Sequence, residues 1–179
     1  SLKPNQTYDF SEKNVVNRNL WLTGPDTGGN FIKSGGYLVA WMGPVNETTD
    51  PYPVGTWNFT SPSGPVTKHV QEIYWIPGMA NATDLDTIKG SIVNNGALIS
   101  SFNWTNTSYD ETHASYYCPT CTGSNHCINL VGWDDNYSRN NFTTPALGDG
   151  AFLLRNSWGT SWGDQGYGWI SYHDPTIGK

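Results

Sequence analysis

The segment LLRNSWGTSWGDQGYGWI, residues 153–170, is the part of the sequence on which the fold assignment depends most. Its two ends are apolar, as strands are, and a lone Asn156 follows the first of them. Thirty residues upstream, in GSNHCINLVGWD at 123–134, His126 likewise stands at the start of a predicted strand. If the two strands are antiparallel neighbours, their ends meet, and the histidine and the asparagine can lie side by side.

A histidine beside an asparagine is a pairing that suits nucleophilic catalysis. The imidazole accepts the proton of a cysteine or serine nucleophile, and a third group accepts the other ring N–H, which fixes the tautomer and orientation. An asparagine amide oxygen does this without carrying charge. On spacing alone, a structural histidine is the commoner case, so the pattern by itself does not decide between the two interpretations.

The residues around both positions resemble the papain-like cysteine peptidases. Asn125–Trp133 resembles the histidine strand of that family, and Arg155–Tyr167 resembles its asparagine motif almost position for position. Weaker resemblances lie upstream, where Phe10–Val16 is similar to a Ser-Glu-Gln helix, Gly28–Asn30 to a Gly-Gly turn, and Asp50–Pro53 to a Tyr-Pro segment. The resemblance therefore covers most of the chain.

The resemblance implies catalytic roles for three residues. His126 would be the general base and acid, and Asn156 would orient it. Trp158 would shield the bond between them from water, which matters because hydrogen bonds are stronger at low local dielectric. The alternative for Trp158 is plain core packing.

Four further residues are implied to bind substrate. Gly28 and Gly29 would present their backbone to an extended peptide, because a residue without a side chain lets two backbones approach closely. Asn125 and Cys127 flank His126, and Cys127 would help to line the P2 pocket. An ordinary turn is the alternative for Gly29, and a small core residue is the alternative for Cys127.

The nucleophile of the family is missing from this sequence. In the family the cysteine precedes the histidine by roughly 130 to 150 residues, which would place it upstream of Ser1. We therefore expect a partner, either an upstream segment or a separate chain, that carries the nucleophilic cysteine and the glutamine of the oxyanion hole. The start at Ser1 rather than Met favours a processed or excerpted polypeptide.

The three cysteines present do not fill this role. Cys118 and Cys121 are predicted to form a local disulfide in an oxidising compartment, with a free thiol pair as the alternative. None of the three begins a helix, where a thiolate would be favoured. The spacing Cys118-x2-Cys121-x4-His126 copies three ligands of a zinc knuckle, but Val131 occupies the fourth position, so neither a metal nor a cofactor is expected.

Eight sequons of the form N-x-[ST] indicate a glycosylated extracellular surface. They begin at Asn5, Asn46, Asn58, Asn81, Asn103, Asn106, Asn136 and Asn141. The alternative is that loops rich in Asn and Thr generate sequons by chance. The prediction is a protein that is secreted or displayed at the cell surface.

Charge and hydropathy exclude other classes. The net charge is −6, and the 9 Lys and Arg residues form no basic stripe, so nucleic acid is not expected as a partner. No apolar run approaches the roughly 20 residues that span a membrane.

The apolar pattern predicts helices first and strands later, which indicates an α+β fold. Helices are expected at 11–18, 30–42 and 83–95, and strands at 97–102, 127–133, 150–156 and 167–172. With the resemblance, this becomes a papain-like fold without its nucleophile helix. Residues 1–96 would form the remainder of the helical domain with a surface loop and a crossover helix. Residues 97–179 would form the strand-rich, barrel-like domain.

Two functions are compatible with the sequence. The first is the C-terminal chain or region of a secreted papain-like cysteine endopeptidase that hydrolyses peptides or proteins, and that would be inactive as this chain alone. The second is a catalytically inactive papain-like module that serves as a binding or structural subunit of an extracellular glycoprotein assembly.

Overall fold

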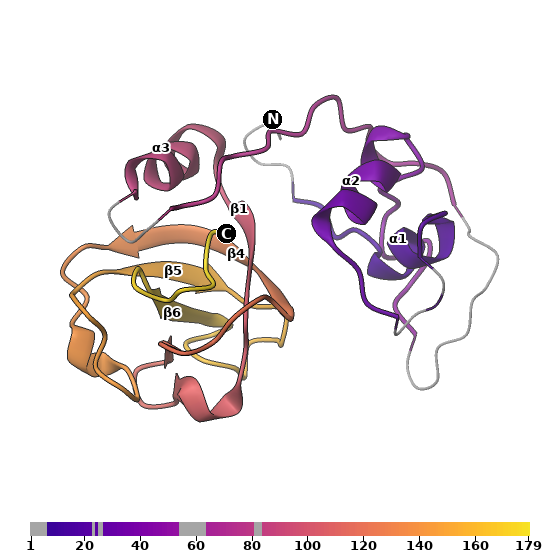
Figure 1. Ribbon diagram of the computed structural model, residues 1–179. Coiled ribbons are helices and arrows are strands. Elements are labelled where there is room, and N and C mark those ends of the chain that lie inside the picture. The colour runs from indigo at the N-terminus through magenta and orange to yellow at the C-terminus, as the bar shows by residue number, and fades with distance from the viewer. Residues whose placement is uncertain (1–6, 23, 25–26, 54–63, 81–83) are drawn as a thin grey trace. The chain divides into compact units, whose positions relative to one another are not determined.

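Helices occupy the first part of the chain and strands the second, as Figure 1 shows. The computed structural model describes residues 7–22, 24, 27–53, 64–80 and 84–179. Asn5, Asn58 and Asn81, three of the sequon positions, lie outside these residues, and so does Thr83, the expected start of the third helix. The α+β papain-like class expected from the sequence is confirmed.

The chain divides into two compact units, Ser1–Trp75 and Ile76–Lys179. This boundary lies about twenty residues before the 96/97 division inferred from sequence. The third helix accounts for the difference, because it packs on the strands that follow it. The third helix thus groups with the strands in the second unit.

The first unit contains two short helices with side-chain caps. In α1 (Glu12–Arg18) the hydroxyl of Ser11 accepts a hydrogen bond from the Asn14 N–H, and in α2 (Phe31–Val39) the amide of Asn30 accepts one from Lys33. Such caps satisfy backbone donors that the first turn leaves without a partner. The second helix ends at Val39 rather than Met42, because Trp41 adopts a φ of 56° that a helix does not continue.

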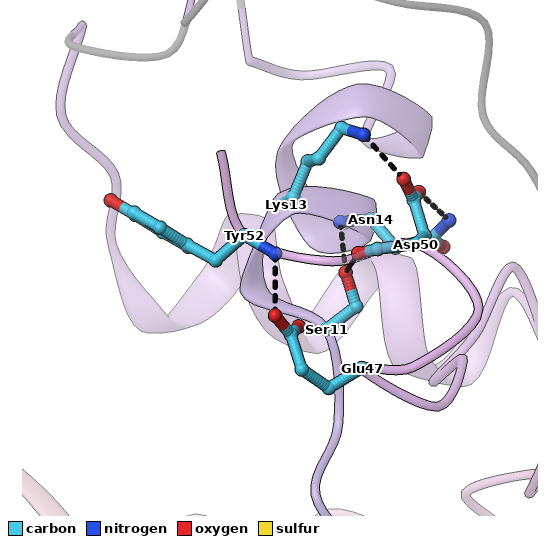
Figure 2. A network of polar contacts seen from close by, with 6 residues as sticks. All are labelled: Ser11, Lys13, Asn14, Glu47, Asp50 and Tyr52. Carbon is cyan, nitrogen blue, oxygen red and sulfur yellow. Dashed lines mark hydrogen bonds and ion pairs between the residues drawn. The ribbon is translucent and has the colours of Figure 1, made fainter. Parts of the chain in front are cut away.

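A buried carboxylate joins α1 to the segment after residue 45 (Figure 2). Asp50 is 1% exposed; its Oδ1 lies 2.7 Å from Lys13 Nζ, and its Oδ2 accepts a hydrogen bond of 2.7 Å from Asn14 Nδ2. Ser11 Oγ donates to the Asp50 carbonyl at 2.5 Å. Tyr37 donates to Asn14 Oδ1 at 3.0 Å, and its own burial raises the pKa of Tyr37 to about 12. A buried charge is costly unless it is paired and hydrogen-bonded. This network therefore fixes the position of the Asp50 segment against α1.

The second unit is a helix packed on a six-stranded sheet. Its elements are α3 (Asp86–Asn95), β1 (Leu98–Phe102), η1 (Asn106–Ser108), β2 (Tyr109–Asp110), β3 (Ser115–Tyr116), β4 (His126–Asp134), η2 (Arg139–Asn141), β5 (Ala151–Arg155) and β6 (Tyr167–Ser171). The strand order is β1-β4-β5-β6-β3-β2, and each pairing is antiparallel except the one between β3 and β6.

Strand alternation builds the core of the second unit. Alternate residues point to one face of a sheet, so the buried side chains of β4 are Ile128 and Leu130, and those of β5 include Phe152 and Leu154. The helix α3 covers this face with Ile88 and Ile92, which belong to the same cluster. Among the described residues, no helix is long and apolar enough to cross a membrane.

Candidate active site

The register of β4 and β5 brings a histidine and an asparagine together. Strand β4 begins at His126, β5 ends at Arg155, and Asn129 pairs with Arg155 across the antiparallel ladder. His126 thus lies three residues before the paired Asn129 on β4, and Asn156 directly follows the paired Arg155 on β5, so both stand at the same end of this ladder. His126 Nε2 is 2.9 Å from Asn156 Oδ1, a hydrogen-bonding distance.

The orientation of the Asn156 amide follows from a second contact. The backbone N–H of Ser157 donates to Asn156 Oδ1 at 2.8 Å, and the backbone N–H of Asn156 donates to the Gly166 carbonyl at 2.9 Å. An N–H needs an acceptor, so the oxygen and not the amide nitrogen faces the imidazole. His126 Nε2 must then be the protonated ring nitrogen, which leaves the lone pair on Nδ1 to accept a proton.

Asn156 is held in a nearly dry position. The residue is 8% exposed, and its Nδ2 has no hydrogen-bond partner within the described part of the chain. A buried donor without a partner costs about 1–3 kcal/mol. The amide oxygen of Asn156 therefore faces His126, while its amide nitrogen stays without a hydrogen-bond partner among the described residues.

Trp158 covers the imidazole. The centroid of the Trp158 ring lies 4.6 Å from that of His126, at an interplanar angle of 30°. The ring of Trp162 in turn stands edge to face against Trp158, with centroids 5.7 Å apart. Trp158 is nevertheless 41% exposed. It is a surface residue lying over the histidine, and it keeps water from one side of the ring.

Asn125 is engaged with the backbone of Trp104. Its Nδ2 donates to the Trp104 carbonyl at 3.0 Å, and its Oδ1 accepts from the Trp104 N–H at 2.6 Å. The side chain predicted to contact substrate is thus tied to a neighbouring strand end. Trp104 was not singled out from the sequence, because its contact with Asn125 joins residues 21 apart and leaves no local pattern.

Gly28 and Gly29 belong to the first unit. Gly28 has a φ of 72°, and no atom lies within 4 Å of the position that a Cβ would take. Both glycines line a hollow of about 360 Å³ together with Leu22 and Ser34. Their backbone is exposed and open to a ligand.

None of the three cysteines offers an activated thiol. A disulfide joins Cys118 and Cys121, and Cys127 is a free, exposed residue. Cys127 follows His126 on β4, where successive side chains point to opposite faces. Partial burial of its thiol raises the pKa of Cys127, which disfavours the reactive thiolate.

The comparison with known families agrees with this geometry. The family model described as papain family cysteine protease matches residues 2–177. The chain belongs to the papain family of cysteine proteases.

Solved structures of papain-family proteases superpose on the chain. A clostridial cysteine protease, Cwp84 after propeptide cleavage, is 29% identical with a TM-score of 0.85, and the match covers 98% of this chain and 46% of that one. The protease and lectin-like domains of Cwp84, a surface layer associated protein of Clostridium difficile, give 28% identity, a TM-score of 0.82, and coverage of 98% and 41%. Procathepsin L2 from Tenebrio molitor larval midgut is 19% identical with a TM-score of 0.65, covers 96% and 52%, and shares the fold. The chain therefore spans about half the length of these structures.

The sequons of this papain-family chain differ in their surroundings. Asn106 and Asn136 are exposed, whereas Asn46, Asn103 and Asn141 are partly buried. The Asn103 amide donates to the Thr122 carbonyl at 3.0 Å. The asparagines of the sequons thus differ in their exposure to solvent.

The zinc-knuckle spacing gives no metal cluster. Cys118 and Cys121 are bonded to each other, and His126 Nε2 faces Asn156. In the part of the chain that the structure describes, no group of three or more His, Cys, Asp or Glu side chains could hold a metal ion.

Proposed function

We propose that this chain is the C-terminal part of a secreted papain-like cysteine endopeptidase, whose nucleophilic cysteine is supplied by an upstream segment or by a separate associated chain. The observation that carries the proposal is the 2.9 Å contact between His126 Nε2 and Asn156 Oδ1, beneath the Trp158 ring. This contact leaves the Nδ1 lone pair of His126 free to accept the proton of a thiol.

The proposed reaction uses both ring nitrogens of His126. Nδ1 takes the proton of the incoming cysteine thiol, and Asn156 Oδ1 accepts the Nε2–H and stabilises the resulting imidazolium. The thiolate attacks the peptide carbonyl, and His126 returns the proton to the leaving amine. A water then donates a proton to Nδ1 as it attacks the acyl-enzyme, which releases the acid and regenerates the thiol.

The cysteines of the chain support a nucleophile from elsewhere. Two of the three cysteines, Cys118 and Cys121, are joined in a disulfide and have no free thiol. The third, Cys127, has its pKa raised by partial burial, the opposite of what activation requires.

Three observations support extracellular placement. The disulfide between Cys118 and Cys121 suits an oxidising compartment. Cwp84, which is 28% identical, is a surface layer associated protein. With exposed sequons at Asn106 and Asn136, these observations favour a secreted or surface-displayed glycoprotein.

The second candidate is an inactive papain-like module of an extracellular assembly. The observation in its favour is that two of the three cysteines of residues 1–179 form a disulfide, and that partial burial raises the pKa of the third, Cys127. In that case the histidine and asparagine would be structural.

Active-site labelling separates the two candidates. The complete polypeptide that contains this chain is treated with an electrophilic epoxide that alkylates papain-like thiolates, and the labelled peptide is located by mass spectrometry. We expect one labelled cysteine outside residues 1–179, loss of labelling in His126→Ala, and normal labelling in the control Cys127→Ser. Label on Cys127 would contradict the endopeptidase; no label on the folded protein would contradict it too and would favour the inactive module.

A further inference from the structure

The side chain of Asn125 extends the ladder between β1 and β4 beyond the last paired residues. Phe102 pairs with His126 at the end of that ladder, and the Asn125 N–H donates to the Phe102 carbonyl at 3.1 Å. The Asn125 amide then makes two further bonds, to the N–H and the carbonyl of Trp104. An amide side chain reproduces a backbone donor and acceptor, so Trp104 is fixed as though it were still in a strand.

Trp104 is further fixed by its ring. The indole N–H donates to Asn106 Oδ1 at 2.9 Å, and the ring stacks on Tyr116 with centroids 5.1 Å apart and an interplanar angle of 22°. The ring of Tyr109 tilts against it at 5.2 Å. Backbone and side chain of Trp104 are thus held by separate partners.

The ring of Trp104 also contacts the ring of Trp158. The rings of Trp104 and Trp158 stand edge to face, with centroids 4.8 Å apart and an interplanar angle of 80°, and Trp104 is itself 6.4 Å from the His126 ring. Edge-to-face contact is a preferred geometry for aromatic pairs. Trp158, which is 41% exposed, therefore takes its position over the imidazole from a neighbour that is anchored more firmly than itself.

We infer that Asn125 and Trp104 form a positioning unit that holds Trp158 over the His126–Asn156 hydrogen bond. The unit does not touch the reacting atoms; it acts through Trp158, which limits the access of water to the Nε2–H. The inference rests on the proposed catalytic role of His126, but what it predicts directly is the protection of the His126–Asn156 hydrogen bond from water. This arrangement gives Asn125 a role different from substrate binding.

The inference is tested on the Nε2–H proton of His126. In the complete polypeptide, with ¹⁵N-labelled histidine, the rate of exchange of this proton with water is measured by NMR. Trp104→Ala and Asn125→Ala are expected to raise the rate by about tenfold, as loss of one aromatic contact of usual strength would. Trp104→Phe, which keeps an aromatic ring edge, should stay within about threefold of the parent rate.

Two comparisons decide whether the effect passes through Trp158. Trp158→Ala should raise the exchange rate by at least as much, and adding Trp104→Ala to it should change the rate no further, because coupled residues are not additive. Asn129→Ala, an exposed asparagine on the same strand, and Trp75→Ala, an exposed tryptophan of the first unit, are the matched controls and should leave the rate unchanged.

Each outcome has a defined meaning. Parent-like exchange in both Trp104→Ala and Asn125→Ala, or a full Trp104→Ala effect in the Trp158→Ala background, would overturn the inference. If Trp104→Ala fails to fold, Asn125→Ala and Trp104→Phe still give the comparison. Faster exchange in a polypeptide that hydrolyses no peptide would support the positioning unit while removing the proposed function.

Discussion

Phe102 and His126 lie directly opposite each other on β1 and β4, and their rings meet edge to face with centroids 5.6 Å apart. Phe102 is 1% exposed and belongs to the core, whereas His126 is only partly buried. His126 thus lies at the edge of the core, where its imidazole packs against the buried ring of Phe102.

Replacing Phe102 should therefore affect stability and site geometry together. Phe102→Ala is expected to lower the free energy of unfolding by about 3–5 kcal/mol, the range for emptying a buried aromatic site. Phe102→Leu should lower it by less than half as much, because it retains most of the apolar volume. Urea unfolding of the two variants gives the values; equal losses would mean that ring shape, and not volume, supports this part of the core.

The second prediction concerns the catalytic pair. In the complete polypeptide, His126→Ala is expected to lower kcat for a fluorogenic peptide by at least about 10²-fold, the lower bound for loss of a general acid and base. Asn156→Ala should reduce kcat with less change in KM, because its proposed role is to orient His126 and not to bind substrate. The matched control is Asn129→Ala on the same strand; a parent-like kcat in His126→Ala would contradict the assigned role.

Local sequence patterns predicted the elements that carry the site, for physical reasons. Ser11 is the N-cap residue expected for the first helix, and its hydroxyl accepts the Asn14 N–H. The strands around His126 and Asn156 differ from the expected ranges by one residue at each end, because alternation and turn residues are local properties. The two-residue strands β2 and β3 were missed, since so short a stretch carries no period.

What could not be predicted depends on contacts between distant residues. Ile88 and Ile92 place α3 against the sheet, although helix periodicity alone does not name the surface that a helix covers. The tie between Asn125 and Trp104 is equally non-local. The motif singled out Asn125, but the hydrogen bonds of its side chain to the backbone of Trp104 join residues 21 apart and leave no local signal.

The third prediction concerns pH. Asp174 is 3% exposed, and burial raises the pKa of its carboxyl group despite hydrogen bonds from Thr176 and from the Cys118 N–H. A carboxyl group whose folded pKa exceeds the unfolded value of about 3.9 favours the folded state most at low pH. Its contribution is therefore lost as the pH rises from about 4 through the raised folded pKa.

Asp174→Asn tests this directly. The variant loses overall stability, because an amide cannot accept at both oxygen positions, but it should lack the decline in unfolding free energy as the pH rises above about 4. The difference between the parent and variant curves, measured by urea unfolding at successive pH values, isolates the contribution. Parallel curves would show that the Asp174 pKa is the same in the folded and unfolded states.

The fourth prediction concerns the disulfide. Closing a loop as short as that between Cys118 and Cys121 constrains the unfolded chain modestly, by about 2 kcal/mol. Cys118→Ser with Cys121→Ser should lower the free energy of unfolding by this amount, and a reductant should destabilise the parent but not the double variant. An equal effect of the reductant on both proteins would show that the stabilisation comes from elsewhere.

The last prediction concerns the carboxylate shown in Figure 2. Asp50→Ala removes the partner of Lys13, whose side chain is 17% exposed, together with an acceptor for Asn14. Breaking a buried ion pair by deleting one member costs about 3–5 kcal/mol, because the remaining charge is left unpaired. Hydrogen exchange of the α1 amides, which reports on the first unit alone, should accelerate accordingly. Glu12→Ala, an exposed acid on the same helix, is the control and should leave exchange nearly unchanged; unaltered protection in Asp50→Ala would mean that α1 is held by its apolar contacts instead.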